Sequence, residues 1–576
     1  MIDKAGDCVS RISRTIAFGI FGFICFYLFL LSIFSTCVIW YDTEGTYYLS
    51  DFPWLLMAGL AGMTGLFFLC RKFVRKILDR RMALMGGVTL VWLVLVIIFV
   101  ANTDIEMIHD QARVYEAMQH LLDGDYATWQ PGGYMYAYPF QNGLMILYLP
   151  LRIFFGDHTY LVIQGVNILF MELLAVGFYK LGKKYFGTNA GVLSYIGILF
   201  FLPLWGYIKY MYGNLPGISL AVWAIYLLTL FMEKGKWKHA AGSAFCILFA
   251  CIYKSNFLIY LIAMAIVLLV DAMAGKKGKN IAAVLLLAGA AIVASKGPAL
   301  LVHWFTGCVT DQGIPKIHWV TMGLHESYLA PGWYSGDAMK WYAENNFSRE
   351  ICVQDAWKSI RESLELFGRE KEYCMRFFAR KTASIWNNPT FECFAVVVKG
   401  NLFGTLEYWM KDILYSGGIV NTILTVIMDI MQSIYLFGTI LYLMYCRKEK
   451  ELQKAIPLVA FIGGVLMHTF WEGKCQYTII YFVVLIPYAF AGYQECIRML
   501  ERRAANRTGV KSLFRSRAVW AFGILLAVIL GISVSDNTVL NSTIKVGGDG
   551  GDYIWMCREC DYWRSDSFTK EGPREE

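Results

Sequence analysis

Ionisable side chains lie at the ends of several apolar runs of this sequence, where they could act on a charged molecule at a membrane surface. The carboxylates of Asp104 and Asp110 follow one long apolar run, and the amines of Lys209, Lys254 and Lys474 lie in short segments between others. Ionisable groups at membrane depth are costly, which makes them candidates for function. An amine beside a phosphate neutralises its charge and lowers the cost of its departure. These residues therefore favour a site for a phosphate-bearing lipid whose head group lies at the interface.

Each of these residues also has a structural interpretation. Asp110 could cap the helix that follows it, because a helix N-terminus favours an anion. Lys254 could extend to the lipid head groups without binding a ligand. Glu472 and Lys474 could pair with each other, and Lys209 is typical of an interfacial anchor. The sequence alone leaves these alternatives open.

The composition is that of a membrane protein. Of 576 residues, 57% are hydrophobic and 17% are charged, and the mean hydropathy is +0.47. These values lie outside the range of soluble globular proteins. The formal net charge is +8, but the basic residues form short clusters between apolar runs. Orientation in a membrane explains such clusters, so we expect membrane lipids and no nucleic acid as partners.

Hydropathy predicts an all-α polytopic fold with about thirteen transmembrane helices, because each span needs roughly 20 apolar residues. We place the spans near residues 16–40, 52–70, 82–103, 159–179, 188–206, 214–232, 239–253, 256–271, 280–303, 416–445, 455–471, 477–494 and 518–534.

The charges of the connecting loops orient these spans. Lys and Arg cluster in alternate loops, at residues 71–81, 180–184, 234–238, 276–279, 447–450 and 498–511. By the positive-inside rule these loops are cytoplasmic. The N-terminus is then cytoplasmic, and the C-terminal tail is external.

The longest polar segments fall on the external side. In segment 104–150, Val114, Met118, Leu121 and Leu122 have helical spacing, which predicts an interfacial helix, and GGYMYAYPFQNG is typical of a loop. The second segment, 304–417, predicts an irregular part followed by a helical stretch from Ser348 to Trp386. Long loops of this kind are usually functional.

Common cofactor motifs are absent from the sequence. No Walker A loop, dinucleotide fingerprint, HExxH motif or nucleophile elbow occurs in a credible context. Cys557 and Cys560 form a CxxC motif, but a structural zinc site would need two more ligands nearby. We therefore expect no cofactor and no metal, and an enzyme here would draw its energy from an activated lipid substrate.

Several motifs resemble a known family. Asp110 and Gln111 followed by ARVYEAMQHLLDGDY and PFQNGL, YKSN at Lys254, and GKCQYTIIYFVVLIPYAFAG occur in this order on the external side. Together they resemble the GT-C superfamily of glycosyltransferases, most closely the branch of protein O-mannosyltransferases and lipid A aminoarabinose transferases. The resemblance covers roughly residues 82 to 495. One departure is Gln111, because the family has an Asp-Glu pair at this place.

This resemblance implies that a sugar passes from a polyprenyl-phosphate donor to an acceptor hydroxyl on the external face, with inversion at the anomeric carbon. Such a displacement needs a carboxylate to remove the acceptor proton and a cation to take up the phosphate charge. By matching the family, Asp110 is the expected general base, with Asp104 as the substitute. The expected donor contacts are Lys254, Lys474, Tyr477 and Lys209, and the expected acceptor or loop contacts are Gln111, Tyr138 and Glu472.

The resemblance also divides the chain. Residues 1–81 would form two additional N-terminal spans, and residues 82–303 a catalytic membrane module that includes the external loop 104–158. Residues 304–417 form the long external loop, residues 418–534 the C-terminal spans, and residues 535–576 an external tail.

Other function classes stay open. A transporter or flippase of lipid-linked glycans would need polar groups running through the bundle, and a polysaccharide polymerase or ligase would show an Arg-rich external loop. Glu172 and Asp429 fall within spans, where hydrogen bonding between helices is the favoured interpretation. The acceptor could be a glycan, a lipid or a protein. The expected location is a bacterial plasma membrane.

Overall fold

The computed structural model describes residues 2–39, 45–51, 53–69, 76–275, 278–310, 312–327, 329–401, 404–445 and 451–505. Apart from one two-stranded hairpin, the regular structure of this part of the chain is helical. Nine helical segments in it are long and apolar enough to cross a membrane. The prediction of an all-α polytopic membrane protein is confirmed.

Each of these nine segments overlaps one predicted span, but the segments Pro139–Phe186 and Tyr408–Tyr445 begin in residues that were predicted to form loops. They are α1 (Ile2–Phe34), α4 (Arg81–Ala101), α7 (Asn142–Phe155) with α8 (Thr159–Phe186), α11 (Asn214–Lys234), α13 (Leu258–Gly275), α14 (Gly278–Thr306), α20 (Tyr408–Leu414) with α21 (Ile419–Tyr445), α22 (Ile456–Phe470), and α23 (Cys475–Phe482) with α24 (Ile486–Ala505).

Three further predicted spans coincide with shorter or bent helices. The span at 188–206 is α9 (Thr188–Leu199) followed by α10 (Pro203–Gly206) and η4 (Tyr207–Lys209), with a bend of 52°. Pro203 lacks a backbone N–H, which explains a break there. The spans at 52–70 and 239–253 are α2 (Pro53–Leu69) and α12 (Trp237–Tyr253), each 17 residues long. The last predicted span, 518–534, lies outside the described residues.

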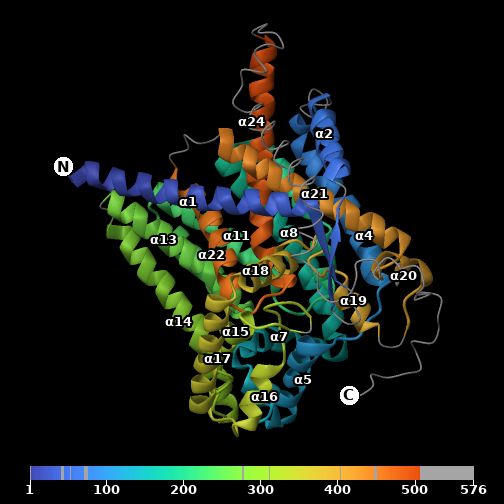
Figure 1. Cartoon of the computed structure of the whole chain (residues 1–576), viewed down its shortest axis with the longest axis vertical. Helices are drawn as coiled ribbons and strands as arrows, with labels where there is room; N and C mark the ends of the chain where they lie inside the picture. The colour runs from blue at the N-terminus through green and yellow to red at the C-terminus, as the bar shows by residue number, and fades with distance from the viewer. Residues whose placement is uncertain are drawn as a thin grey trace.

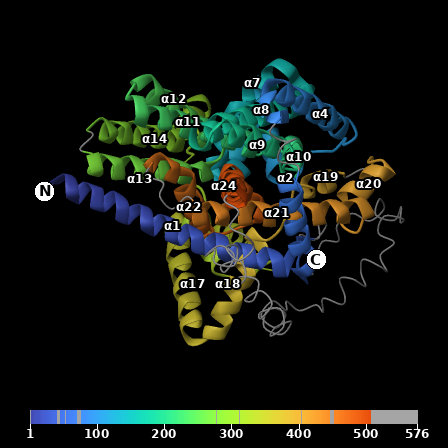
Figure 2. The ribbon, with the colours of Figure 1, turned by 90° about the horizontal axis from the view of Figure 1, so that it is seen from above.

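The core of the bundle combines early and late helices. Helix α8 packs against α9 and α11, α11 packs against α12, and α21 packs against α24. Close helix packing in membranes depends on small residues. A Cβ placed on Gly492 would lie only 2.0 Å from the carbonyl oxygen of Gly438, so α21 and α24 touch at their backbones. Figure 2 shows α24 and α22 surrounded by the other helices.

The N-terminal segment lies across the bundle and is not detached from it (Figure 1). Helix α1 packs against α13, α21 and α22. The predicted helical span to residue 40 is too long, because the helix ends at Phe34 and the chain continues as β1 (Ser35–Ile39), which pairs antiparallel with β2 (Thr46–Ser50). The β-branched Thr36, Val38 and Ile39 favour this extended backbone.

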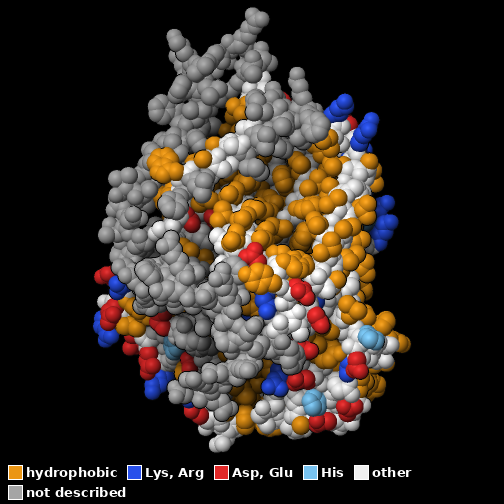
Figure 3. All heavy atoms as spheres, turned by 90° about the vertical axis from the view of Figure 1, so that its right-hand side faces the viewer, with side chains coloured by type: hydrophobic (Ala, Val, Ile, Leu, Met, Phe, Trp, Pro, Cys, Tyr) orange, Lys and Arg blue, Asp and Glu red, His pale blue; other side chains and the backbone are white. Residues whose placement is uncertain are grey.

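One side of the molecule carries a broad apolar surface. Figure 3, viewed from the side of α4, shows apolar side chains over the upper part and charged side chains gathered below them. Leu90, Val94 and Ile97 are exposed on α4. Lipid tails would cover such an apolar surface. The line in Figure 3 where apolar side chains give way to charged ones is therefore the place where we expect the membrane to meet water.

The first segment predicted to be external contains a helix at the place where an interfacial helix was predicted. Helix α5 spans His109–Asp123, and it buries Val114 and Met118 while Leu122 is exposed. Gly124 ends it in a left-handed conformation that glycine adopts without strain. The other elements here are η1 (Ala127–Trp129), α6 (Tyr134–Ala137), η2 (Pro139–Gln141) and η3 (Gly156–His158).

The long segment predicted to be external, residues 304–417, is mostly helical. Its helices are α15 (Ile317–Gly323), α16 (Asp337–Glu344), α17 (Arg349–Arg369), α18 (Lys371–Trp386) and α19 (Ala395–Gly400). The stretch predicted to be helical from Ser348 to Trp386 is helical, but it breaks at Glu370 into α17 and α18. Figure 2 shows these two helices as a hairpin that projects from the bundle. The remaining described elements are η5 (Ser255–Phe257), η6 (Leu452–Ala455) and η7 (Val483–Leu485).

Candidate active site

Asp110 faces a tyrosine cluster from the first turn of α5. Ile108 is the N-cap residue and no side chain caps the helix, so Asp110 does not serve as a cap. The hydroxyl of Tyr212 donates a hydrogen bond to Asp110 Oδ2 at 2.9 Å, and the hydroxyl of Tyr134 also contacts this carboxylate. The positive end of the helix dipole favours a carboxylate at this place. These two tyrosine contacts therefore hold the Asp110 carboxylate in a fixed position, and the carboxylate does not cap helix α5.

Gln111 and Gln141 fix the tyrosines around Asp110. The backbone N–H of Met211 donates to Gln111 Oε1 at 3.1 Å. The Gln141 amide donates to the hydroxyls of Tyr134 and Tyr212, at 3.3 and 3.2 Å. Gln111 thus ties α5 to the loop before α11, which is the loop contact expected of it.

Lys254 lies on the other side of Tyr212. It follows α12, and its Nζ donates to Asn214 Oδ1 at 2.6 Å. The same nitrogen lies 4.4 Å from the centroid of the Tyr212 ring and 5.0 Å from that of Tyr477. Within the described residues no carboxylate forms an ion pair with it. Burial lowers the pKa of Lys254 to about 7, although the charges of Asp110 and Glu472 oppose this shift.

Lys474 pairs with a residue that the sequence did not reveal. Its Nζ lies 3.5 Å from Glu392 Oε1 and 5.6 Å from the centroid of the Trp333 ring. The Glu392 side chain is 3% exposed and that of Lys474 is 15% exposed. Burial opposes the charge on Lys474, but Glu392 and Tyr210 raise its pKa overall. Lys474 is therefore a positive charge held at a fixed place, and its ion pair is with Glu392 instead of Glu472.

The loop that carries Glu392 is fixed by its own side chains. Phe391 and Glu392 have left-handed backbones, with φ values of 48° and 58°. Such conformations are costly and persist only where surrounding contacts enforce them. The backbone N–H of Glu392 donates to Asn388 Oδ1 at 3.2 Å, and the Asn388 amide donates to the carbonyl of Cys37 in β1 at 2.8 Å. The N-terminal hairpin thus supports this part of the site.

We expect the Glu392→Gln variant to unfold at a lower temperature than the wild type. Breaking a buried ion pair by neutralising one partner leaves the other charge without compensation, which costs about 3 kcal/mol or more. The measurement is thermal unfolding of the protein in lipid nanodiscs. The double variant Glu392→Gln/Lys474→Met should recover part of the loss, because no buried charge remains. Equal midpoints for the wild type and Glu392→Gln would contradict this interpretation.

Glu472 and Lys381 are two further buried charged residues close to Lys474 and Lys254. Burial raises the pKa of Glu472 to about 7, although the charges of Lys474 and Lys381 oppose the shift. The backbone N–H of Glu472 donates to the carbonyl of Trp319 at 2.6 Å. Lys381 is buried, and its Nζ donates to the carbonyls of Gly323, Thr469 and Trp471. Lys381 therefore joins α18 to the end of α15, the end of α22 and the loop that carries Glu472.

The remaining predicted site residues lie in two separate groups. Tyr138 and Tyr477 belong to the same cluster as Asp110, because the charges of Asp110 and Glu472 act on both hydroxyls. Lys209 is buried and donates to Gln164 Oε1 at 3.1 Å. The charge of Asp104 acts on Lys209, so these two predicted residues form a group of their own.

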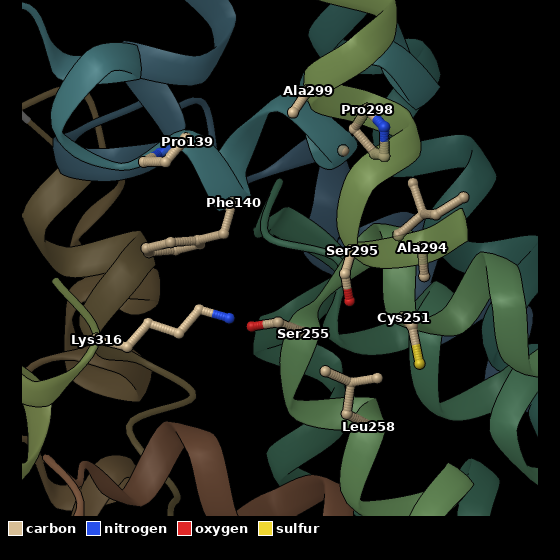
Figure 4. A pocket seen from close by; sticks show the side chains of 12 residues that line it. Pro139, Phe140, Cys251, Ser255, Leu258, Ala294, Ser295, Pro298, Ala299 and Lys316 are labelled. Carbon is tan, nitrogen blue, oxygen red and sulfur yellow. The ribbon is translucent and has the colours of Figure 1, made fainter. Parts of the chain in front are cut away.

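A pocket opens beside Lys254. It is lined by η2, the start of α7, the end of α12, η5, the start of α13 and the outer part of α14. Figure 4 shows the Lys316 amine pointing toward the hydroxyls of Ser255 and Ser295, while Phe140, Leu258 and Pro298 form apolar walls. The pocket thus combines one cation and two hydroxyls with apolar surface.

No group of three or more His, Cys, Asp or Glu side chains that could hold a metal ion occurs in the part of the chain that the structure describes. Cys557 and Cys560 lie outside that part. The expectation that the reaction needs no metal and no cofactor stays a prediction.

The comparison with known families decides the class of the protein. The family described as dolichyl-phosphate-mannose-protein mannosyltransferase matches residues 143–297. The chain is a membrane glycosyltransferase of the GT-C type. The predicted resemblance to this superfamily is therefore confirmed. No curated protein matches the glycosyltransferase.

The match covers one part of the candidate site of this glycosyltransferase. The matched residues run from α7 into α14 and include Tyr212, Asn214 and Lys254. Asp110 and Lys474 lie outside the match, and only the fold brings both close to Tyr210, which stacks on Tyr212. Glu392 and Lys381 were not predicted from the sequence. Charged side chains in helices and loops are usually exposed to solvent, and only the structure shows that these two are buried.

Proposed function

We propose that this glycosyltransferase transfers a sugar from a polyprenyl-phosphate donor to an acceptor hydroxyl at the external membrane face, with inversion at the anomeric carbon. One observation supports this above all others. Tyr212 donates its hydroxyl proton to Asp110 at 2.9 Å and places its ring 4.4 Å from the amine of Lys254. A candidate base and a candidate phosphate-binding cation are thus separated by a single side chain.

Asp110 is the proposed general base. As the acceptor oxygen forms its bond to the anomeric carbon, its proton passes to the carboxylate of Asp110. Tyr212 and Gln111 act as positioning residues, because they fix the carboxylate and the adjoining loop. Asp104 is less suited to this role, since it lies with Lys209.

Lys254 and Lys474 are the proposed cations for the leaving group. The bond between the anomeric carbon and the phosphate oxygen breaks, and its electron pair stays on the phosphate oxygen. Positive charge held beside that oxygen stabilises the transition state more than the ground state, because the negative charge grows as the bond breaks. The neighbouring Glu392 keeps Lys474 positively charged. Lys254 takes up its positive charge when a phosphate approaches, because the negative phosphate stabilises the protonated amine.

The pocket of Figure 4 suits the lipid part of the donor. It adjoins Lys254 through Ser255 and has apolar walls from Leu258, Ala294 and Pro298. A phosphate at Lys254 would place the first isoprenoid unit near these walls. We also propose a cytoplasmic N-terminus and an external C-terminus, on the basis of the loop charges, and a bacterial plasma membrane as the location.

The test uses the full-length protein in lipid nanodiscs with polyprenyl phosphates that carry different sugars. We expect release of free polyprenyl phosphate from at least one donor, and an inverted anomeric configuration when the product is examined by NMR. Retention of configuration would contradict the use of a single displacement. If no donor is turned over, transport of lipid-linked glycans becomes the better hypothesis.

The polar residues inside the bundle give transport no specific support. The hydroxyl of Tyr195 donates to Glu172 Oε1 and contacts the hydroxyl of Thr89, so that α4, α8 and α9 are joined by hydrogen bonds. This agrees with the interpretation that polar residues within spans tie helices together.

A further inference from the structure

Six aromatic side chains form a continuous strip beside the candidate active site. We call this set the aromatic strip; its members are Tyr134, Tyr138, Phe140, Trp319, Tyr334 and Trp471. They come from α6, η2, α15 and two external loops, so the fold brings together residues from three distant parts of the chain.

Ring contacts connect the members of the aromatic strip. The ring centroids of Tyr134 and Tyr138 are 5.0 Å apart, and those of Tyr138 and Trp319 are 6.4 Å apart. Phe140 lies 5.8 Å from Trp319, which stacks on Trp471 at 6.4 Å. These distances fall within the range of favourable aromatic pairs. The strip is therefore an organised surface and not a chance collection of exposed rings.

The aromatic strip begins at the two carboxylates of the site. Tyr134 contacts Asp110, and the charge of Glu472 acts on Tyr138. The strip thus runs outward from the proposed base, which is the direction from which an acceptor hydroxyl must arrive.

The aromatic strip is accessible and lies with the external segments. Phe140 is 43% exposed and Tyr334 is 40% exposed, while the other members are partly buried. Trp319, Tyr334 and Trp471 lie outside the candidate membrane spans, and Phe140 lies at the start of one. Aromatic rings that are partly exposed beside a candidate site mark a binding surface more often than scattered single rings do.

We propose that the aromatic strip is the acceptor subsite and that it binds a saccharide chain, which makes the acceptor a glycan. This inference rests on the proposed function, because it assigns the acceptor class of the same reaction. A pyranose ring turns its C–H groups to the negative face of an aromatic ring and its hydroxyls to the sides, where carboxylates accept their hydrogen bonds.

The residues beside the rings fit such a ligand. The hydroxyls of Tyr138 and Tyr334 lie 3.4 Å apart, and the carboxylates of Asp110 and Glu472 act on Tyr138. Rings that alternate with hydroxyls and carboxylates suit neutral polyols, whereas a lipid acceptor would need a continuous aliphatic surface within the membrane.

The test measures saccharide binding without a donor. Mannotetraose, cellotetraose and chitotetraose are added separately to the full-length protein in nanodiscs, and binding is followed by saturation-transfer NMR with titration. We expect at least one of them to bind, and a threonine-rich peptide to bind more weakly. The Trp319→Ala variant should bind that saccharide about tenfold more weakly, which corresponds to the loss of one stacking contact.

Two further variants keep the result specific. Trp319→Phe should recover part of the affinity, because it restores an aromatic face. Phe140→Ala gives an independent reading at a more exposed position should Trp319→Ala fold poorly. Trp357→Ala on α17 is the matched control, since this tryptophan is 57% exposed and makes no ring contact with the aromatic strip.

The inference is overturned if none of the three saccharides binds, if the peptide binds more tightly, or if Phe140→Ala and Trp357→Ala behave alike. Its failure is distinguishable from failure of the proposed function. Wild-type protein that turns over the donor but binds no saccharide removes the glycan acceptor alone. Saccharide binding by a protein that turns over no donor removes the transfer reaction.

Discussion

The Asp110→Asn variant should turn over the polyprenyl-phosphate donor about 10²- to 10⁴-fold more slowly than the wild type, which is the usual contribution of a general base. An amide cannot accept the acceptor proton, but it keeps the size of the carboxylate and still accepts the hydrogen bond from Tyr212. We therefore expect donor affinity to change little. The measurement is release of free polyprenyl phosphate at saturating donor, together with the dissociation constant of the donor.

Glu116→Gln is the matched control for this variant. Glu116 lies on the same helix α5, is half exposed and pairs with Arg113 at the surface. Neutralising it removes one negative charge from the helix without touching the site, so turnover should stay at the wild-type level. Equal rates for Asp110→Asn and the wild type would exclude Asp110 as the base.

The second large effect concerns Lys254. We expect Lys254→Met to bind the donor about tenfold to a hundredfold more weakly, because a charge-assisted hydrogen bond to phosphate is lost. Lys296→Met is the control, since Lys296 is an exposed lysine on α14. Similar donor affinity for the two variants would contradict the assignment of Lys254 to the phosphate.

The pKa of Lys254 also predicts how donor affinity depends on pH. Its pKa is lowered to about 7, so the amine is charged below this pH and loses its charge as the pH rises. Donor affinity should therefore be highest below pH 7 and should fall above it, and binding should take up a proton because the phosphate raises the pKa again. Lys254→Arg should keep the affinity and lose most of this dependence, because arginine stays charged.

Glu472 contributes to the same pH range with the same sign. Its pKa is raised to about 7, so it becomes negative as the pH rises and then repels the phosphate. The dependence that remains in Lys254→Arg should disappear in Lys254→Arg/Glu472→Gln. An unchanged pH profile in the double variant would show that neither group controls donor binding.

Sequence reasoning identified the residues that lie next to membrane spans. Asp110 follows a span after a short polar segment, and Lys254 separates two apolar runs, so their positions near the interface follow from hydropathy. The interfacial helix that begins beside Asp110 was predictable from the spacing of Val114 and Met118, because a local pattern determines it.

Contacts between distant segments could not be predicted in this way. Glu392 and Lys474 form an ion pair only because the loop after α18 folds against the start of α23, and Lys381 is buried by loops that follow other helices. The hairpin after Phe34 also escaped prediction, since Ser35–Ile39 continues an apolar run and only its pairing with Thr46–Ser50 distinguishes it from a helix.

The most direct test of the central claim is an experimental structure of the Asp110→Asn variant with a polyprenyl-phosphate sugar bound. The account predicts that a phosphate oxygen lies about 3 Å from Lys254 Nζ. It also predicts that the anomeric carbon turns the face opposite the phosphate toward position 110 and the aromatic strip. A phosphate bound beside Lys209, or an anomeric carbon turned away from position 110, would contradict it.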